Sequence, residues 1–104
     1  MSLVDELQAA LPNWQISQAG DYTVADNWQH RVYFTDDSGH ITARVCVTRD
    51  VFVSGAGRSV GDALDGLRVE LARTERDMRA SFSDDDYDVA IGCQRALNAL
   101  GGGK

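Results

Sequence analysis

The sequence is poor in the residues that mark several common protein classes. Of its 104 residues only two are cysteine, one is proline and one is lysine. Cys46 and Cys93 have no ligand pattern around them, so we interpret them as buried free thiols rather than as a disulfide or a metal pair. No apolar run reaches the roughly 20 residues of a membrane helix, and Asp5 and Glu6 stand where a signal peptide carries positive charge. We therefore expect a single cytoplasmic domain over residues 1–104.

The net charge of the chain limits the classes of partner that it can bind. Sixteen acidic residues against ten basic ones give a net charge of −6, and thirteen of the acids are aspartate. Such a surface repels phosphate backbones, so we expect neither direct nucleic-acid binding nor membrane binding by the bulk surface, although a local arginine patch would allow the former. A basic protein partner is favoured instead. The alternative is that the charge only keeps the protein soluble.

The first half of the chain predicts a short helix followed by an antiparallel meander. Residues 2–11 have leucines one turn apart, Ser2 stands at the N-cap position, and Pro12 ends the helix. The clearest turn is residues 36–39, where aspartates and serine precede glycine. Apolar and polar residues alternate on either side of that turn, so one face of the sheet should be covered and the other open. The predicted strands are residues 14–17, 22–25, 28–35, 41–48 and 51–54.

The longest helix is predicted just after these strands. The last strand runs into glycine-rich residues 55–57, which we expect to break it, and Ser59 with Asp62 gives a start signal of the capping-box kind. Gly61 and Gly66 weaken such a helix, and we expect close packing on the sheet to be the reason for them. Apolar residues recur at helical spacing up to residue 79: Val60, Ala63, Leu64, Leu67, Leu71 and Met78.

A last helix is predicted from Ser83, its N-cap, with three aspartates in its first turn to match the helix dipole. Glycines 101–103 end it. Its apolar stripe comprises Tyr87, Ala90, Cys93, Leu97 and Leu100. The fold class is therefore α+β: a short N-terminal helix, a four- or five-stranded antiparallel meander sheet, one long helix packed on the sheet, and a short C-terminal helix.

Two stretches are similar to ligand loops without matching them. Residues 55–58 join a strand to a helix start, where backbone amides attract anions, but Val60 replaces a fingerprint glycine and no P-loop lysine follows. A plain turn is the preferred interpretation, and an anion site assisted by the adjacent arginine stays open. The acids at 84–88 alternate as in a calcium loop, yet Val89 stands where glycine is required. We predict no metal and no cofactor.

The acidic residues are concentrated in two places. Residues 83–88 form the densest negative stretch, and residues 36–37 add two carboxylates at a hairpin tip. Either these acids stay in water, or they face an Arg- or Lys-rich partner. Tyr33, beside Arg31 and Arg44, is the first aromatic candidate for an anchor on the open sheet face. The predicted partner-binding residues are Tyr33, Asp36, Asp37, Asp84, Asp85, Asp86 and Asp88.

No catalytic set can be assembled from the sequence. His30 and His40 flank the same predicted hairpin, but no nucleophile or carboxylate has a spacing that would hold it beside either of them. The two histidines and two cysteines also lack zinc-ligand spacing. We interpret both histidines as ordinary strand-end residues, and an enzyme is the least expected class.

Residues 52–67, FVSGAGRSVGDALDGL, resemble the strand, glycine turn and helix opening of HicB-type antitoxins and related small domains. The resemblance implies antiparallel strands that lead into an amphipathic helix, and neutralisation of a small toxin. In size and charge the chain also resembles small acidic proteins of phages and mobile elements, which present carboxylates where phosphates would lie.

These observations predict a non-catalytic protein-binding module whose acidic surface engages a basic, nucleic-acid-handling partner. An anti-CRISPR-like inhibitor encoded by a phage or mobile element is the preferred form. The alternatives are a HicB-like antitoxin and a structural or assembly homo-oligomer, including a homodimer through an open sheet face or edge.

Overall fold

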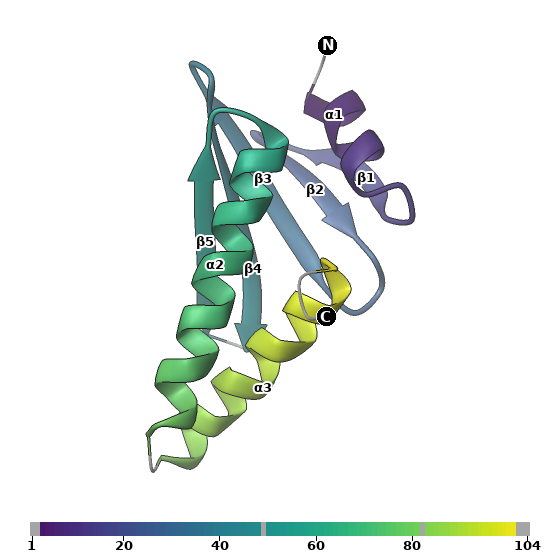
Figure 1. The fold of residues 1–104 in the computed structure, drawn as a ribbon. Helices are drawn as coiled ribbons and strands as arrows, with labels where there is room; N and C mark the ends of the chain where they lie inside the picture. Colours follow the sequence, from purple (N-terminus) through teal and green to yellow (C-terminus); the bar gives the residue numbers. More distant parts are fainter. Residues whose placement is uncertain (1–2, 49, 82, 102–104) are drawn as a thin grey trace.

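The computed structural model describes residues 3–48, 50–81 and 83–101 of the chain. The predicted cap Ser2 and the glycines 102 and 103 lie outside the described residues. The order of elements confirms the predicted α+β class (Figure 1). The elements are α1 (Leu3–Ala10), β1 (Gln15–Ala19), β2 (Tyr22–Asp26), β3 (Arg31–Asp37), β4 (His40–Thr48), β5 (Val51–Gly57), α2 (Val60–Arg79) and α3 (Asp84–Ala99).

The five strands form one antiparallel sheet in sequence order, so β1 and β5 are its edges. The β3–β4 hairpin turns on Ser38 and Gly39, whose φ angles of 56° and 87° are the positive values that a two-residue hairpin turn of this kind requires. The Oδ1 atom of Asp36 accepts a hydrogen bond from the Gly39 amide at 3.1 Å. The predicted turn is therefore confirmed, with its two aspartates at the end of β3.

The third strand begins three residues later than predicted, at Arg31. The preceding loop is held by Asn27, whose Oδ1 accepts hydrogen bonds from the amides of Gln29 and His30. Trp28 has a φ of 79° and is 93% exposed, so its predicted place in a strand is wrong. Asparagine at this position competes for backbone amides that would otherwise extend the ladder.

The strand β5 is longer than predicted because its glycines pair with β4 instead of ending the strand. Gly55 lies opposite Ala43 and Gly57 opposite Ile41. A Cβ atom at Gly55 would lie 2.1 Å from the backbone nitrogen of Leu67, so glycine lets α2 rest directly on the strand. Gly66 serves the same approach from the helix side, because a Cβ atom there would lie 3.2 Å from the carbonyl oxygen of Ala56.

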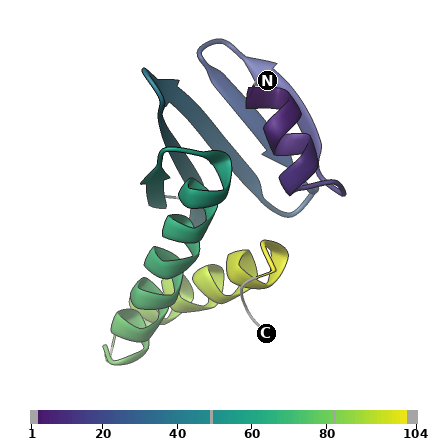
Figure 2. The same cartoon turned by 45° about the horizontal axis from the view of Figure 1, so that its top comes forward.

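One core joins all the helices to a single face of the sheet. The buried residues of α2 are those predicted from its apolar spacing, with Met78 packed at the margin. Figure 2 shows α2 and α3 as a V, with α1 over the β1–β2 side. The predicted stripe of α3 is corrected at Tyr87, which is 53% exposed, and Val89 is buried in its place. The opposite face of the sheet carries no helix among the described residues.

The helix α3 reaches β4 through a second glycine contact. A Cβ atom at Gly92 would lie 2.1 Å from the carbonyl oxygen of Val47, so only glycine permits this approach. Both cysteines are free, as predicted. Cys93 is buried in α3 as expected, whereas Cys46 in β4 is only half-buried, so its predicted burial is wrong. The predicted close packing does not explain Gly61, since the side chain of Ser59 at 3.8 Å is its nearest neighbour.

Candidate functional site

The open face of the sheet carries a hollow lined by aromatic rings and one guanidinium group. Tyr33 lies opposite Arg44 in the sheet, and its ring meets that of Tyr22 edge-on with 5.8 Å between centroids. The guanidinium carbon of Arg44 lies 4.4 Å from the centre of the Phe52 ring. These four side chains line a hollow of about 250 Å³. The structure thus places the predicted anchor Tyr33 on the open face beside Arg44.

Phe52 was not predicted to lie on this face. Residues on alternate positions of β5 point to opposite sides of the sheet, and Val53 faces the core, so the alternation itself was the available signal. Arg31 does lie beside Tyr33, as predicted: the Tyr33 hydroxyl is the main cause of its raised pKa, and Arg31 also forms an ion pair with Asp26 at 3.3 Å. The carboxylate of Asp26 also accepts the Trp28 amide, and that hydrogen bond, followed by Arg31, lowers its pKa.

The two predicted acidic patches lie at opposite ends of the molecule. Asp36 and Asp37 lie at the β3–β4 turn at one end, whereas residues 84–88 begin α3 at the other end (Figure 1). The molecule is 45 Å long on its principal axis. The structure therefore does not join them into one surface, and each must be considered separately.

The first turn of α3 differs from the predicted cap. Ser83 occupies the N-cap position, but its side chain makes no capping hydrogen bond. The hydroxyl of Ser81 donates to Asp86 Oδ2 at 2.6 Å instead. Asp86 is consequently held against the preceding turn, while Asp84, Asp85 and Asp88 make no such contact among the described residues. The carboxylates without that contact are the ones available to a partner.

Two of these carboxylates share a hollow with a residue that sequence reasoning missed. Asp85 and Asp88 of α3 line a hollow of about 380 Å³ together with Asp50 from the β4–β5 turn. Val51 and Val89 form its apolar lining, and Thr48 completes it. We call these six residues the acidic hollow.

The lengths of β5 and α2 explain why Asp50 lies there. A strand of 7 residues spans about 23 Å, whereas a helix of 20 residues spans about 30 Å. Because α2 runs back along β5, its end extends past the β4–β5 turn, and α3 returns toward that turn. The length difference was the signal in the sequence that could have placed Asp50 near the start of α3.

The acids of this hollow are not neutralised by described arginines. None of Asp50, Asp85 and Asp88 belongs to an ion pair among residues 3–48, 50–81 and 83–101. The arginines that do form such pairs meet carboxylates of α2 or of β2. The pairs are Arg31–Asp26, Arg68–Asp65, Arg73–Glu70 and Arg79–Glu75.

His30 lines a third hollow, of about 500 Å³, between the loop before β3, strand β4 and helix α3. Its other lining residues are Gln29, Cys46, Val47, Gly92 and Arg95. Burial of the imidazole lowers the pKa of His30, and the nearby charge of Arg95 lowers it further. No carboxylate lines this hollow within the described chain. His40, the other predicted strand-end histidine, is exposed and lies opposite Asp37.

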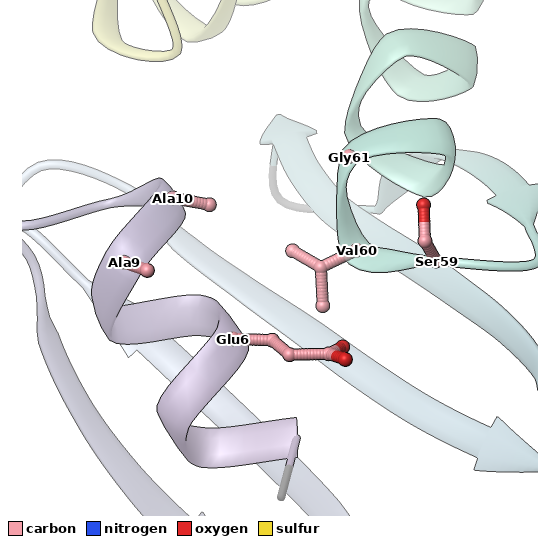
Figure 3. Close-up of a pocket in the computed structure, with 6 residues that line it drawn as sticks. All are labelled: Glu6, Ala9, Ala10, Ser59, Val60 and Gly61. Atoms are coloured by element: carbon pink, nitrogen blue, oxygen red, sulfur yellow. The ribbon is translucent and has the colours of Figure 1, made fainter. Parts of the chain in front are cut away.

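A fourth hollow, of about 360 Å³, separates α1 from the start of α2 (Figure 3). The side chain of Glu6 extends from α1 toward Val60, and its negative charge suits the positive end of the α2 dipole. Ser59 caps the helix by accepting the Asp62 amide at 3.1 Å. Glu6 and Asp62 already place two acids near this helix start, and packing explains the glycines before it. The geometry therefore favours a plain junction over an anion site at residues 55–58.

Comparison with known proteins gives no family for this chain. It matches no protein-family model, no curated protein sequence and no solved structure at a significant level. In the part of the chain that the structure describes, no three His, Cys, Asp or Glu side chains are arranged to hold a metal ion. No described helix has the length and apolarity needed to cross a membrane.

Proposed function

We propose that the protein is a non-catalytic binding module whose acidic hollow engages a basic protein partner. The observation that carries the proposal is the convergence of Asp50, Asp85 and Asp88 on one hollow without a described arginine to neutralise them. Three carboxylates from two separate elements make a stronger local field than a solvated helix start alone.

The lining of the acidic hollow suits one long basic side chain. An arginine or lysine has an aliphatic stem that packs on apolar surface and a charged head that stays near polar groups. Val51 and Val89 provide the apolar surface, and the carboxylates provide hydrogen-bond acceptors for the head. A guanidinium fits best, because its five donors can serve several carboxylate oxygens at once.

The position of the acidic hollow at one end of the molecule favours an inhibitor that occupies a phosphate-binding surface. A basic side chain of that surface would enter the acidic hollow and pair with its carboxylates. In such a contact, carboxylates take the places of phosphates, and the association depends steeply on salt. A nucleic-acid-handling protein is the proposed partner, with the chain acting as an inhibitor of the kind that a phage or mobile element encodes.

The proposal is tested by affinity capture from host cells with three forms of the tagged protein. The forms are the wild type, D85N/D88N, and the matched control D36N/D37N, which removes the same charge at the opposite end. We expect one basic, nucleic-acid-binding protein to be retained by the wild type and control, lost from D85N/D88N, and released by salt or by competing DNA. Equal retention by all three forms would overturn the proposal. Retention of a small toxin would support the antitoxin form instead.

A second candidate function is assembly of identical copies through the open sheet face. The observation that favours it is the exposure of Phe52, at 45%, and Tyr22, at 41%, around the aromatic hollow. Large rings exposed together are typical of interfaces. Light scattering after size exclusion would then report a dimer for the wild type and a monomer for F52S, and a monomeric wild type would exclude this candidate.

A further inference from the structure

The hollow beside His30 has the opposite character to the acidic hollow. Its lining combines one guanidinium, one imidazole and one carboxamide, from Arg95, His30 and Gln29. In a chain of net charge −6, this hollow of about 500 Å³ has no lining carboxylate among the described residues, and it differs from the aromatic hollow around Arg44 in adding an imidazole and a carboxamide to its guanidinium. All three groups can donate hydrogen bonds to an oxygen atom.

Packing places Arg95 at this hollow. Gly92 rests on the carbonyl group of Val47, which fixes this face of α3 directly over β4. Arg95 follows three residues later and therefore stands on the same face of the helix. It forms no ion pair or hydrogen bond with any described side chain, so its guanidinium group is free to bind a ligand.

The imidazole of His30 offers one nitrogen to this hollow. Its Nδ1 atom is buried and has no hydrogen-bond partner among the described residues. Nε2 is not enclosed in this way, so it is the ring nitrogen that can carry a proton toward a ligand. Nε2 is the nitrogen left to donate to a ligand.

We propose that this hollow binds a small oxyanion, a phosphoryl or carboxylate group, through Arg95 and the Nε2–H of His30. The guanidinium supplies the charge and a forked pair of donors, and the imidazole adds a third. The proposal does not rest on the function proposed above, because the acidic hollow and this hollow share no lining residue.

Anion binding is coupled to the protonation of His30. The charged or titratable groups that face the ring are Arg95 from α3, Cys46 from β4, and the paired Asp26 and Arg31 at the adjoining side. With the hollow empty, burial and Arg95 keep the pKa of His30 below 6.5. A bound anion offsets the charge of Arg95 and stabilises the imidazolium, so the pKa must rise.

Nuclear magnetic resonance titration of the histidine ring protons tests the proposal on the full chain. Inorganic phosphate and acetate are the two probes, added separately at constant ionic strength with chloride. We expect saturable shifts at His30 and a rise of its pKa by about half a unit or more. Exposed His40 is the internal control and should not respond. R95Q should weaken binding by about tenfold, while R76Q, at an exposed arginine of α2, should not change it.

The two probes distinguish the source of the oxyanion. A stronger response to phosphate identifies a phosphoryl ligand, and a stronger response to acetate identifies a carboxylate ligand; either one supports the proposal. Protection of the Cys46 thiol from a thiol reagent by the same probe gives a second measurement, with buried Cys93 as the unreactive reference. The absence of a saturable response at His30, or an equal response in R95Q, would overturn it.

Discussion

Gly55 of β5 and Leu67 of α2 are in backbone contact: a side-chain carbon at position 55 would lie 2.1 Å from the Leu67 nitrogen. The helix and strand therefore cannot accept even a methyl group between them. We expect Gly55→Ala to lower the free energy of unfolding by about 3 kcal/mol, because relief of the clash must move α2 off the sheet. Urea denaturation measures this loss.

Gly61→Ala is the matched control for that substitution. Position 61 has no neighbour closer than 3.8 Å and an ordinary φ, so alanine should fit there and stabilise the helix by up to about 1 kcal/mol. Similar effects of the two substitutions would contradict the contact described for Gly55.

The two helix starts should respond differently to loss of their serines. The hydroxyl of Ser59 accepts a hydrogen bond from the Asp62 amide, whereas the side chain of Ser83 makes no capping hydrogen bond. We expect Ser59→Ala to cost about 1 kcal/mol of stability and Ser83→Ala less than about 0.3 kcal/mol. Thermal or urea unfolding of the two variants checks this, and a large loss for Ser83→Ala would show that it caps α3 after all.

Arg68 connects α2 to the end of α3. Its Nε and Nη2 atoms donate to the Leu100 carbonyl at 3.1 and 2.9 Å, and its Nη1 bonds Asp65 at 2.8 Å. Because the carbonyl is buried behind these donors, we expect Arg68→Ala to cost about 2 kcal/mol. Arg73→Ala, which removes an exposed i,i+3 pair with Glu70, should cost less than about 0.5 kcal/mol. Equal losses would contradict this structural role of Arg68.

Cys93 should make the protein less stable at alkaline pH. Burial, with a smaller effect of Glu75, raises the pKa of its thiol from 9.0 to about 11. Between pH 9 and about pH 11 the unfolded chain loses the thiol proton and the folded chain keeps it. The stability that is present below pH 9 is therefore lost as the pH rises through this range. The loss reaches about 1.4 kcal/mol per pH unit. Cys93→Ala should lack this slope in urea denaturation series, whereas parallel pH profiles would exclude the effect.

Periodic patterns predicted most of the fold. The apolar spacing of α2 and the alternation of β4 each result from the burial of one face of the element. Such burial produces a periodic pattern of apolar residues that is visible in the sequence. The predictions failed where contacts between distant elements decide the local structure. Gly55 and Gly57 signal a turn locally, but they belong to a strand because a helix lies on them. Tyr87 fits an apolar stripe by spacing, yet it is 53% exposed, and its ring lies 6.0 Å from the guanidinium carbon of Arg79 in α2.

The candidate sites were predictable only in part. Tyr33 and the acids of α3 were found because each is chemically conspicuous in its own stretch. Asp50 was missed because its relation to Asp85 and Asp88 depends on the unequal lengths of β5 and α2. The hollow of His30 and Arg95 was missed because it forms only where Gly92 brings α3 onto β4. Such sites come from packing between distant elements, which no local pattern records.

The most direct test of the central claim is a titration with an oligo-arginine peptide, followed by nuclear magnetic resonance at low and high salt. We expect saturable shifts centred on the acidic hollow, including the methyl groups of Val51 and Val89. These shifts should disappear in D85N/D88N and at high salt but persist in D36N/D37N. Shifts spread evenly over all acidic residues, or centred on the β3–β4 turn, would contradict the claim that the acidic hollow is the binding site.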